Sequence, residues 1–488
     1  GTPVLRPLCY HNERKSRFKH WGGIGVLVSF TFENWKSYRT ATTLSMIADR
    51  SRQHNGTLSS SEYYRGLRIL PIAAVYGGNA AGKSNLFDAL RFVQKFVTLG
   101  RQDYADIPVE PFAWADGPDL PSRFSIQILI PQTGENEFCP ARSFQKELIY
   151  RLDFAVNRRQ VCEESLSWYD SQRKNHLLYT RNQEGDISFS PEFRAKIGSE
   201  QINLLQIFAR GTGPRRLFLT NTAGQQLEVF RHVYDWFRNS LQTADNGIQS
   251  PRAAALMSDS EYCARFGRIL RSLGTGVEDI RLEPVPEGMI TAEIQNQIAD
   301  FMSHAPDNAM GQMVVNSGLD VAKQIFVLTK QDDNLSIQRI QTYRNGKPFG
   351  FERESSGTRR LIEILPIFLD LWMHTDCTWA LDEMEREFHT DMTREMLDGF
   401  LESCNQHSRT QALINTHDLM LMDQTLFRKD EIYVVERSAD GCSHLISLKE
   451  YEGIRNDLDL RRSYLDGRFG GRPSIDIAAF EQAIHTGK

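Results

Sequence analysis

The sequence lacks the features of several protein classes. Its seven cysteines are scattered, and none has the spacing of a metal-binding knuckle or a redox pair. No stretch reaches the ~18 to 20 apolar residues that a membrane-spanning helix needs, and the N-terminal residues carry no apolar run of a signal peptide. The chain also has no internal repeat, no low-complexity tract and no sustained heptad pattern. We therefore expect a cytoplasmic protein with reduced thiols, no membrane partner and no long coiled-coil arms.

The chain also lacks an excess of positive charge. Lys and Arg number 57 against 62 Asp and Glu, which gives a formal net charge of -5 and a pI near 6.2. No global basic field attracts nucleic acid, although a local basic groove is left open. With 488 residues, of which 40% are hydrophobic, the chain can bury a large core and is expected to form more than one packing unit.

One short stretch carries a specific chemical signal. Residues 77–84, GGNAAGKS, match the phosphate-loop pattern G-x-x-x-x-G-K-[ST] and lie between an apolar stretch and a helical pattern. The glycines allow the backbone N–H groups and the helix N-terminus to face phosphates. Lys83 is expected to offset charge on the β- and γ-phosphates, and the Ser84 hydroxyl is expected to bind Mg²⁺.

Two further polar sites follow apolar stretches that read as strands. Asp382 and Glu383 end the stretch TWALDE, where an Asp holds Mg²⁺ and the adjacent Glu can polarise the attacking water. His417 ends the stretch LINTH one strand later and is expected near the γ-phosphate. The alternative interpretation is that Asp382 and Glu383 are solvated carboxylates and that His417 has a structural role.

A third element is the stretch ESSGTRR, residues 354–360. Ser355, Ser356 and Gly357 precede an apolar helix, so a hydroxyl, bare backbone amides and a helix N-terminus face the same direction. Taken alone, this pattern is an ordinary helix cap. Together with the phosphate loop and the Asp-Glu pair, it becomes the third member of a set.

This set resembles the ABC-type ATPases of the RecF, Rad50 and SMC kind. The stretch ENWKSY near residue 35 is similar to their Asn-Phe-Arg/Lys-Ser-Phe segment. The stretches LDEMEREFH, with His389, and YLDGRFGGRP are similar to the stand-alone AAA family ATPases of bacterial anti-phage and abortive-infection systems, which are related to the overcoming-lysogenization-defect (OLD) nucleases. Glu354 and Thr358 depart from the usual Leu and Gln of the broader family, and Gln127 is one candidate for the glutamine of the Q-loop.

The resemblance implies a fold, ligands and site residues. The expected fold is α/β, an ABC-type P-loop NTPase fold with a mixed sheet, flanking helices, an antiparallel β patch and a helical insertion. Expected cofactors are ATP and Mg²⁺, with Glu383 and His417 in catalysis and Ser84 and Asp382 at the metal. The nucleotide contacts that the resemblance implies are Asn34, Lys36, Ser37, Gly77, Asn79, Ala81, Gly82, Lys83, Ser84, Asn85, Ser355, Ser356 and Gly357.

Four segments are predicted along the chain. Residues 1–25 form an N-terminal extension that is disordered or an artefact of expression, with a nucleic-acid-binding arm as the alternative. Residues 26–190 form a first ATPase lobe with the phosphate loop, and residues 191–325 form a helical insertion. Residues 326–488 form a second lobe with the signature serines, the Asp-Glu pair, the switch histidine and the C-terminal tail.

The resemblance also implies partners. A head-to-tail homodimer would build each ATP site from the phosphate loop of one chain and the signature serines of another, and a larger homo-oligomer is left open. We expect a sensor or regulatory ATPase that controls a separately encoded effector, a nuclease or toxin, in response to a phage-derived trigger, while this chain itself does not cut nucleic acid. Tyr234, Trp236 and Phe237 either anchor a partner or form the insertion's own core.

Two other functions compete with this interpretation. One is a RecF-like or Rad50-like clamp that binds duplex DNA in repair or maintenance, which makes nucleic acid a candidate partner. The other is the ATP-binding subunit of a transporter, which the large insertion disfavours.

Overall fold

The computed structural model divides the chain into two compact units. The smaller unit contains residues 1–22, 242–375 and 384–396, and the larger contains 23–241, 376–383 and 397–488. The structure describes residues 6–9, 25–99, 106–113, 120–131, 147–244, 260–286, 290, 294–296, 298–299, 309–316, 323–331, 334–373, 376–384, 389–455, 457–471, 477, 481–482 and 484.

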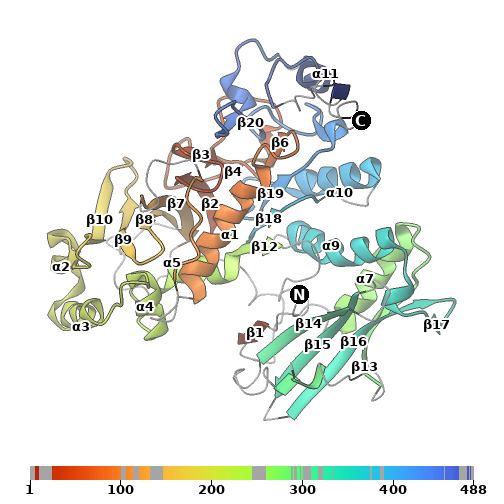
Figure 1. The fold of residues 1–488 in the computed structure, drawn as a ribbon, viewed down its shortest axis with the longest axis horizontal. Helices are drawn as coiled ribbons and strands as arrows, with labels where there is room; N and C mark the ends of the chain where they lie inside the picture. Colours follow the sequence, from red (N-terminus) through yellow and green to blue (C-terminus); the bar gives the residue numbers. More distant parts are fainter. Residues whose placement is uncertain are drawn as a thin grey trace. The chain divides into compact units, whose positions relative to one another are not determined.

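The larger unit contains a mostly parallel sheet (Figure 1). Its strands in this unit follow the order β18 (Thr378–Leu381), β19 (Gln411–Asn415), β6 (Ile72–Gly77), β20 (Ile432–Arg437) and β21 (Ser443–Ser447). The first four run parallel, and β21 pairs antiparallel with β20. Every residue of β18, β19 and β6 is buried, because a parallel strand is covered on both faces, and their largely apolar sequences follow from this.

A second sheet of the larger unit is antiparallel. Its order is β11 (Ile187–Phe189), β10 (Asn175–Arg181), β9 (Val161–Tyr169), β8 (Glu147–Val156), β7 (Ser122–Pro131), β2 (Val26–Glu33) and β3 (Thr42–Ser45). The first part of β7 alternates buried and more exposed residues, as expected for a sheet with one face on the core. A separate ribbon pairs β4 (Ser59–Ser60) with β5 (Arg68–Ile69), next to the short helix η1 (Asn55–Thr57).

Helix α1 (Lys83–Leu99) joins the two sheets into one core. The ring of Phe92 lies 5.2 Å from that of Phe124 on β7, and the ring of Phe96 lies 5.8 Å from that of Phe154 on β8. Trp35, between β2 and β3, packs on Phe92 at 5.1 Å. The expected α/β fold with an antiparallel patch is therefore confirmed in the larger unit.

Residues 191–240 add helices to this same core. They form α2 (Pro191–Ile197), α3 (Ser199–Arg210), α4 (Phe218–Gly224), α5 (Arg231–Asp235) and the π-helical turn η2 (Trp236–Ser240). Trp236 and Phe237 are fully buried, and the Tyr234 hydroxyl donates to the Thr98 carbonyl at 2.9 Å. The interpretation of these aromatics as partner anchors is wrong, because they are core residues.

The smaller unit contains an antiparallel sheet. Its order is β1 (Arg6–Cys9), β14 (Ala309–Asn316), β15 (Lys323–Gln331), β16 (Asn334–Arg344) and β13 (Asp279–Pro284), and β17 (Lys347–Pro348) pairs with β16. Helix α7 (Ser260–Ser272) packs against β13, and η4 (Phe351–Arg353) precedes α9 (Ser356–Trp372) (Figure 1). Asn345 and Gly346 form the hairpin turn between β16 and β17, with φ values of 49° and 69°.

Five further elements complete the description. The larger unit contains η5 (Leu419–Leu421), η6 (Leu448–Glu450) and α11 (Leu460–Leu465). The residues of β12 (Leu241–Ala244) and α10 (Thr390–Ser403) divide between the two units. Among the described residues, no helix has both the length and the apolar character needed to cross a membrane.

The structure differs from the predicted segments in two places. The predicted helical insertion over 191–325 is helical only in part, since β12, β13, β14 and the start of β15 fall within it. In the extension over 1–25, residues 6–9 form a strand that pairs with β14. Three of these strands, β1, β12 and β13, lie at a sheet edge, where pairing uses backbone N–H and C=O groups that every sequence offers, so weak side-chain periodicity gave no sign of them.

A buried carboxyl group precedes β20. Glu431 is 1% exposed, and burial raises its pKa to about 8. Its Oε2 accepts from the Arg428 backbone N–H at 2.8 Å, while Oε1 has no hydrogen-bond partner among the described residues. The folded chain therefore favours the protonated, neutral form of this side chain.

We predict that Glu431→Gln stabilises the chain at neutral and mildly alkaline pH. Because the folded-state pKa is raised from 4.5 to about 8, the favourable contribution of the neutral carboxyl is complete below pH 4.5 and is lost as the pH rises toward 8. Glutamine is never charged, so the variant is expected to gain about 1–3 kcal/mol over the parent at pH 8. Urea unfolding at pH 5 and pH 8 measures the free energy of unfolding of parent and variant, and Glu436→Gln, at an exposed position, is the control. If parent and variant lose the same stability between pH 5 and pH 8, the prediction is wrong.

Candidate functional site

The phosphate-loop stretch connects β6 to α1 at the carboxyl end of the parallel sheet, where ligands of open α/β sheets bind. The backbone of this loop is unusual, with φ values of 60° at Ala80 and 112° at Gly82. A Cβ at Gly77 would lie 2.5 Å from the Val435 carbonyl oxygen, and one at Gly82 would collide with the Ser443 hydroxyl. Glycine is therefore required at both positions by close packing as well as by conformation.

The carbonyl groups of the loop are held by donors from distant segments. The Tyr38 hydroxyl donates to the Gly82 carbonyl at 3.1 Å, and the Ser443 hydroxyl donates to the Ala81 carbonyl at 2.5 Å. Arg437 donates to the Ala80 carbonyl at 3.3 Å. With these carbonyls fixed outward, the loop is preorganised to turn backbone N–H groups toward an anion.

Lys83 lies inside the loop that precedes it. Its side chain is buried, and its Nζ donates to the carbonyls of Gly77 at 2.8 Å and Gly78 at 3.1 Å. Its Nζ also lies 3.5 Å from His417 Nδ1. The structure thus brings together the lysine and the histidine that the sequence predicted at the phosphates.

The predicted metal residues also meet. The Ser84 hydroxyl donates to Asp382 Oδ1 at 3.3 Å, and the Asn415 side-chain amide donates to the same oxygen. Burial raises the pKa of Asp382, and the bonds from Asn415 and Ser84 oppose that rise. Asn415 Oδ1 is buried and has no hydrogen-bond partner among the described residues. A hydroxyl, a carboxylate and an amide oxygen are donors that suit Mg²⁺, so these residues fit the cation.

The predicted catalytic residues lie at the ends of neighbouring parallel strands. Glu383 follows Asp382 after β18 and has a φ of 49°, an uncommon backbone conformation for a residue other than glycine. His417 follows β19 by two residues and is exposed. Both are thus at the same sheet edge as the phosphate loop.

Two residues of the ENWKSY stretch, Asn34 and Lys36, bond to residues outside the phosphate loop. Asn34 accepts from the Phe112 backbone N–H at 3.1 Å and donates to the Leu120 carbonyl at 2.9 Å. Lys36 pairs with Asp88 at 2.7 Å. Neither side chain lines the cavity at the phosphate loop described below.

Ser37 and Asn85 brace the loop directly. Asn85 Nδ2 donates to the Ser37 hydroxyl at 2.8 Å, and the Ser37 and Ser443 hydroxyl oxygens lie within hydrogen-bond distance, at 2.8 Å. The Trp35 indole N–H donates to the Asn85 carbonyl at 2.8 Å. These residues therefore hold the start of α1 against β21.

The signature serines belong to the smaller unit. Ser355 caps α9, since its hydroxyl accepts from the Thr358 backbone N–H at 3.1 Å, and Ser355 and Ser356 are exposed while Gly357 is half-buried. Glu354, where the broader family has Leu, is buried and accepts from Arg344 at 2.5 Å and from the Thr342 hydroxyl at 2.8 Å. The bonds of Glu354 to Arg344 and Thr342 therefore anchor the segment that carries the exposed serines.

A small cavity lies beside the phosphate loop in the larger unit. It measures about 150 Å³ and is lined by Tyr76, Gly77, Gly78, Asn79, Thr416, His417, Leu419 and Tyr464. Gly77, Asn79 and His417 were predicted from the sequence. Tyr464 was not, because no spacing rule connects a residue of the C-terminal tail to the loop.

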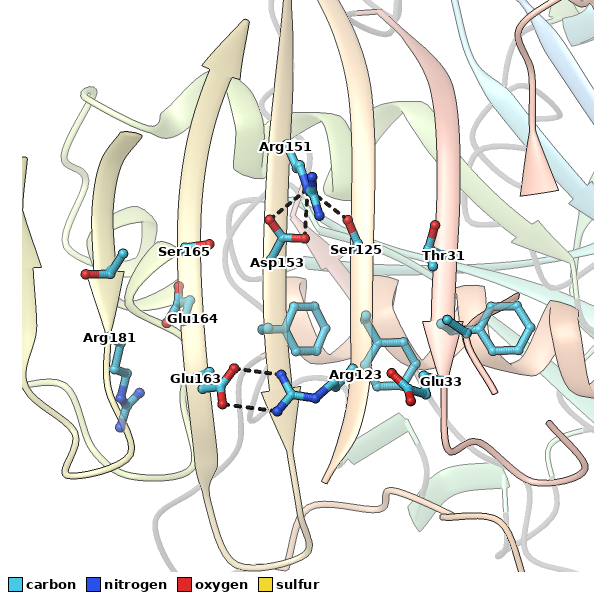
Figure 2. Close-up of a pocket in the computed structure, with 15 residues that line it drawn as sticks. Thr31, Glu33, Arg123, Ser125, Arg151, Asp153, Glu163, Glu164, Ser165 and Arg181 are labelled. Atoms are coloured by element: carbon cyan, nitrogen blue, oxygen red, sulfur yellow. Dashed lines mark hydrogen bonds and ion pairs between the residues drawn. The ribbon is translucent and has the colours of Figure 1, made fainter. Parts of the chain in front are cut away.

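A larger cavity of about 420 Å³ lies on the antiparallel sheet and shares no lining residue with the first. Figure 2 shows that Arg123 faces Glu163, with two hydrogen bonds of 2.7 and 3.1 Å, and that Arg151 faces Asp153. The hydrogen bond between the first two residues raises the pKa of Arg123 and lowers that of Glu163. Arg123 and Arg151 are therefore each paired with a carboxylate on this face.

The predicted Q-loop candidate lies on this antiparallel sheet. Gln127 is in the middle of β7, opposite Arg151 on β8 and Ser29 on β2. It does not line either cavity.

A family model described as "AAA domain, putative AbiEii toxin, Type IV TA system" matches residues 72–423. This match covers more than half of the sequence and includes the phosphate loop, the signature serines, the Asp-Glu pair and His417. The chain belongs to this family. A comparison with curated proteins gives no match.

Among solved structures, the chain is similar to SMC head domains. One is an SMC head bound to the C-winged helix domain of ScpA, with 13% identity, a TM-score of 0.34, and coverage of 86% of this chain and 97% of that chain. A second is the SMC head domain from Thermotoga maritima, with 13% identity, a TM-score of 0.32, and coverage of 86% and 98%. A third is an Smc head with an extended coiled coil, bound to the C-terminal domain of ScpA derived from Pyrococcus furiosus, with 11% identity, a TM-score of 0.34, and coverage of 88% and 98%.

Several residues of this site escaped the sequence prediction. Asn415 stands two positions before His417, and Tyr38 ends the ENWKSY stretch, so both were within motifs already recognised. Ser443 and Arg437 lie outside any motif, and only the pairing of β20 with β21 brings them to the loop. Their positions depend on the three-dimensional fold.

We predict that Lys83→Ala lowers the affinity for Mg-ATP roughly a hundredfold, because the phosphates lose a buried cation that makes charge-assisted hydrogen bonds. Isothermal titration with ATP measures the effect. Lys174→Ala, which removes an exposed lysine from a turn of the same unit, is the control. Equal affinity in the parent chain and Lys83→Ala would contradict the assignment of residues 77–84 as a phosphate site.

Proposed function

We propose that this protein binds and hydrolyses ATP and that it regulates a separately encoded effector of an anti-phage system. The observation that carries the enzymatic part is the convergence of Lys83, Ser84, Asp382 and His417 at the edge of one parallel sheet. The regulatory part rests on the family description, which refers to a type IV toxin–antitoxin system.

Each residue has a distinct role in the proposed reaction. Mg-ATP, when bound, supplies the phosphoryl group and a cation that offsets its charge. Lys83 and the loop N–H groups bind the phosphates, and Ser84 and Asp382 hold the cation. Glu383 accepts a proton from the attacking water, and His417 orients the terminal phosphate.

We further propose that a second copy of the chain completes the site. A cavity of about 150 Å³ is smaller than the roughly 300–1,000 Å³ of pockets that enclose a ligand, so another surface has to cover the nucleotide. The exposed Ser355 and Ser356 at the N-terminus of α9 supply hydroxyl and backbone donors for an anion. In a homodimer, the exposed serines of one chain would cover the nucleotide at the small cavity of the other chain. Larger homo-oligomers are compatible with the same arrangement.

The proposed effector is a nuclease or toxin that binds according to the nucleotide state, with a phage-derived trigger. Such coupling requires the two states to have different affinities for the effector. We place the protein in the bacterial cytoplasm. The relation to OLD nucleases remains a proposal that rests on the LDEMEREFH and YLDGRFGGRP stretches.

A DNA clamp of the RecF or Rad50 kind is the alternative. Phosphate backbones are bound by clusters of unpaired Lys and Arg. On the described face of the antiparallel sheet, Arg123 and Arg151 are each paired with a carboxylate, which does not favour that function (Figure 2).

We predict that Glu383→Gln binds ATP normally but hydrolyses it roughly a hundredfold to ten-thousandfold more slowly, because an amide keeps the shape of the side chain and cannot accept the proton. Phosphate release and ATP retention on the protein measure the two steps. Exposed Glu402→Gln on α10 is the control. Phosphate release from Glu383→Gln at the parent rate would show that another group is the base.

A further inference from the structure

The C-terminal segment Leu460–Gly471 contacts the phosphate loop. The Gly78 backbone N–H donates to the Gly471 carbonyl at 2.7 Å. The Tyr464 hydroxyl, from α11, donates to the same carbonyl at 2.7 Å. One carbonyl oxygen of the tail thus joins the beginning of the loop to a helix that lies almost 400 positions later in the sequence.

Tyr464 has a second role in this arrangement. It is 4% exposed and lines the cavity of about 150 Å³ together with Gly77, Gly78 and His417. The same side chain therefore fixes the carbonyl that holds Gly78 and forms a wall of the space next to His417.

The glycine at position 471 is required for this geometry. Its φ is 65°, and a Cβ there would lie 2.5 Å from Val434 Cγ1 and 3.0 Å from the Val435 carbonyl oxygen. Gly470 has a similar φ of 66°, but a Cβ there would meet only the carboxylate end of the Glu436 side chain, which can move. The two adjacent glycines are therefore not equivalent.

We propose that Tyr464 is a positioning residue of the nucleotide site. Through Gly471 it holds Gly78 and the first half of the phosphate loop in place, and its side chain lines the cavity that His417 also lines. Because His417 is assigned to the terminal phosphate, Tyr464 favours ATP over ADP. This inference rests on the proposed function and adds a residue that determines which nucleotide is bound.

The test compares Mg-ATP and Mg-ADP binding in Tyr464→Phe by isothermal titration. The variant keeps the ring and loses the hydroxyl, so we expect ATP affinity to fall roughly fivefold, the value of one hydrogen bond, and ADP affinity to change by less than about twofold. Gly471→Ala is expected to show the same selectivity with a larger loss, and Gly470→Ala is its control.

Tyr451→Phe is the matched control for the hydroxyl. Tyr451 donates to the Phe469 carbonyl at 2.7 Å, two residues before Gly471, and does not line the cavity. The Tyr451→Phe variant therefore removes a hydrogen bond to the same tail and leaves the hydrogen bond between Gly78 and Gly471 in place. If Tyr464→Phe matches Tyr451→Phe, or lowers ATP and ADP affinity equally, the role of Tyr464 as a positioning residue is overturned.

Amide hydrogen exchange in the unmodified chain gives a second test that does not depend on the folding of any variant. Mg-ATP is expected to slow exchange in peptides from both residues 76–85 and residues 460–471, and Mg-ADP is expected to slow the second set less. Slower exchange in residues 76–85 alone would overturn the inference.

These outcomes separate the inference from the proposed function. If the parent chain does not bind ATP, or if Lys83→Ala binds as tightly as the parent, the proposed function fails and the role of Tyr464 fails with it. If Lys83→Ala loses ATP while Tyr464→Phe behaves as Tyr451→Phe, only the inference about Tyr464 is wrong.

Discussion

The nucleotide site depends on how the carbonyl groups of the phosphate loop are satisfied. A loop that directs its N–H groups at an anion must turn carbonyls toward the protein, and a buried carbonyl without a donor costs about 1–3 kcal/mol. Here Tyr38 and Ser443 supply donors from 44 and 362 positions away in the sequence. The antiparallel sheet and the parallel sheet must therefore both be folded before the loop has its binding conformation.

This dependence explains which parts of the site could be predicted from the sequence. The phosphate loop, the Asp-Glu pair and His417 each follow an apolar stretch, and the carboxyl ends of parallel strands meet at one edge, so local patterns locate them. The hairpin at Asn345 and Gly346 is also predictable from a local pattern, because two residues determine the turn. Each of these features is encoded within a few consecutive residues.

The features that were not predictable involve contacts over long distances in the sequence. Asn34 and Lys36 matched a nucleotide-contact motif, yet their side chains bond to Leu120 and Asp88. The aromatic residues at 234–237 could have formed a surface or a core, and only the packing of η2 decides between the two. The link from Gly471 to Gly78 joins two glycine-containing turns whose sequences give no sign of pairing.

We propose an ATPase site that one chain builds only in part: the phosphate loop lies in one unit, and the exposed serine segment, next to the Arg344–Glu354 ion pair, lies in the other. The most direct test mixes two inactive variants, Lys83→Ala and Ser355→Arg, and measures phosphate release, with Ser355→Ala as a control that loses the helix cap without adding bulk. Mixed dimers contain one site with an unmodified loop and an unmodified serine segment, so we expect activity to return on mixing. Full activity of Ser355→Arg alone, or no recovery in a mixture shown to contain mixed dimers, would contradict the account.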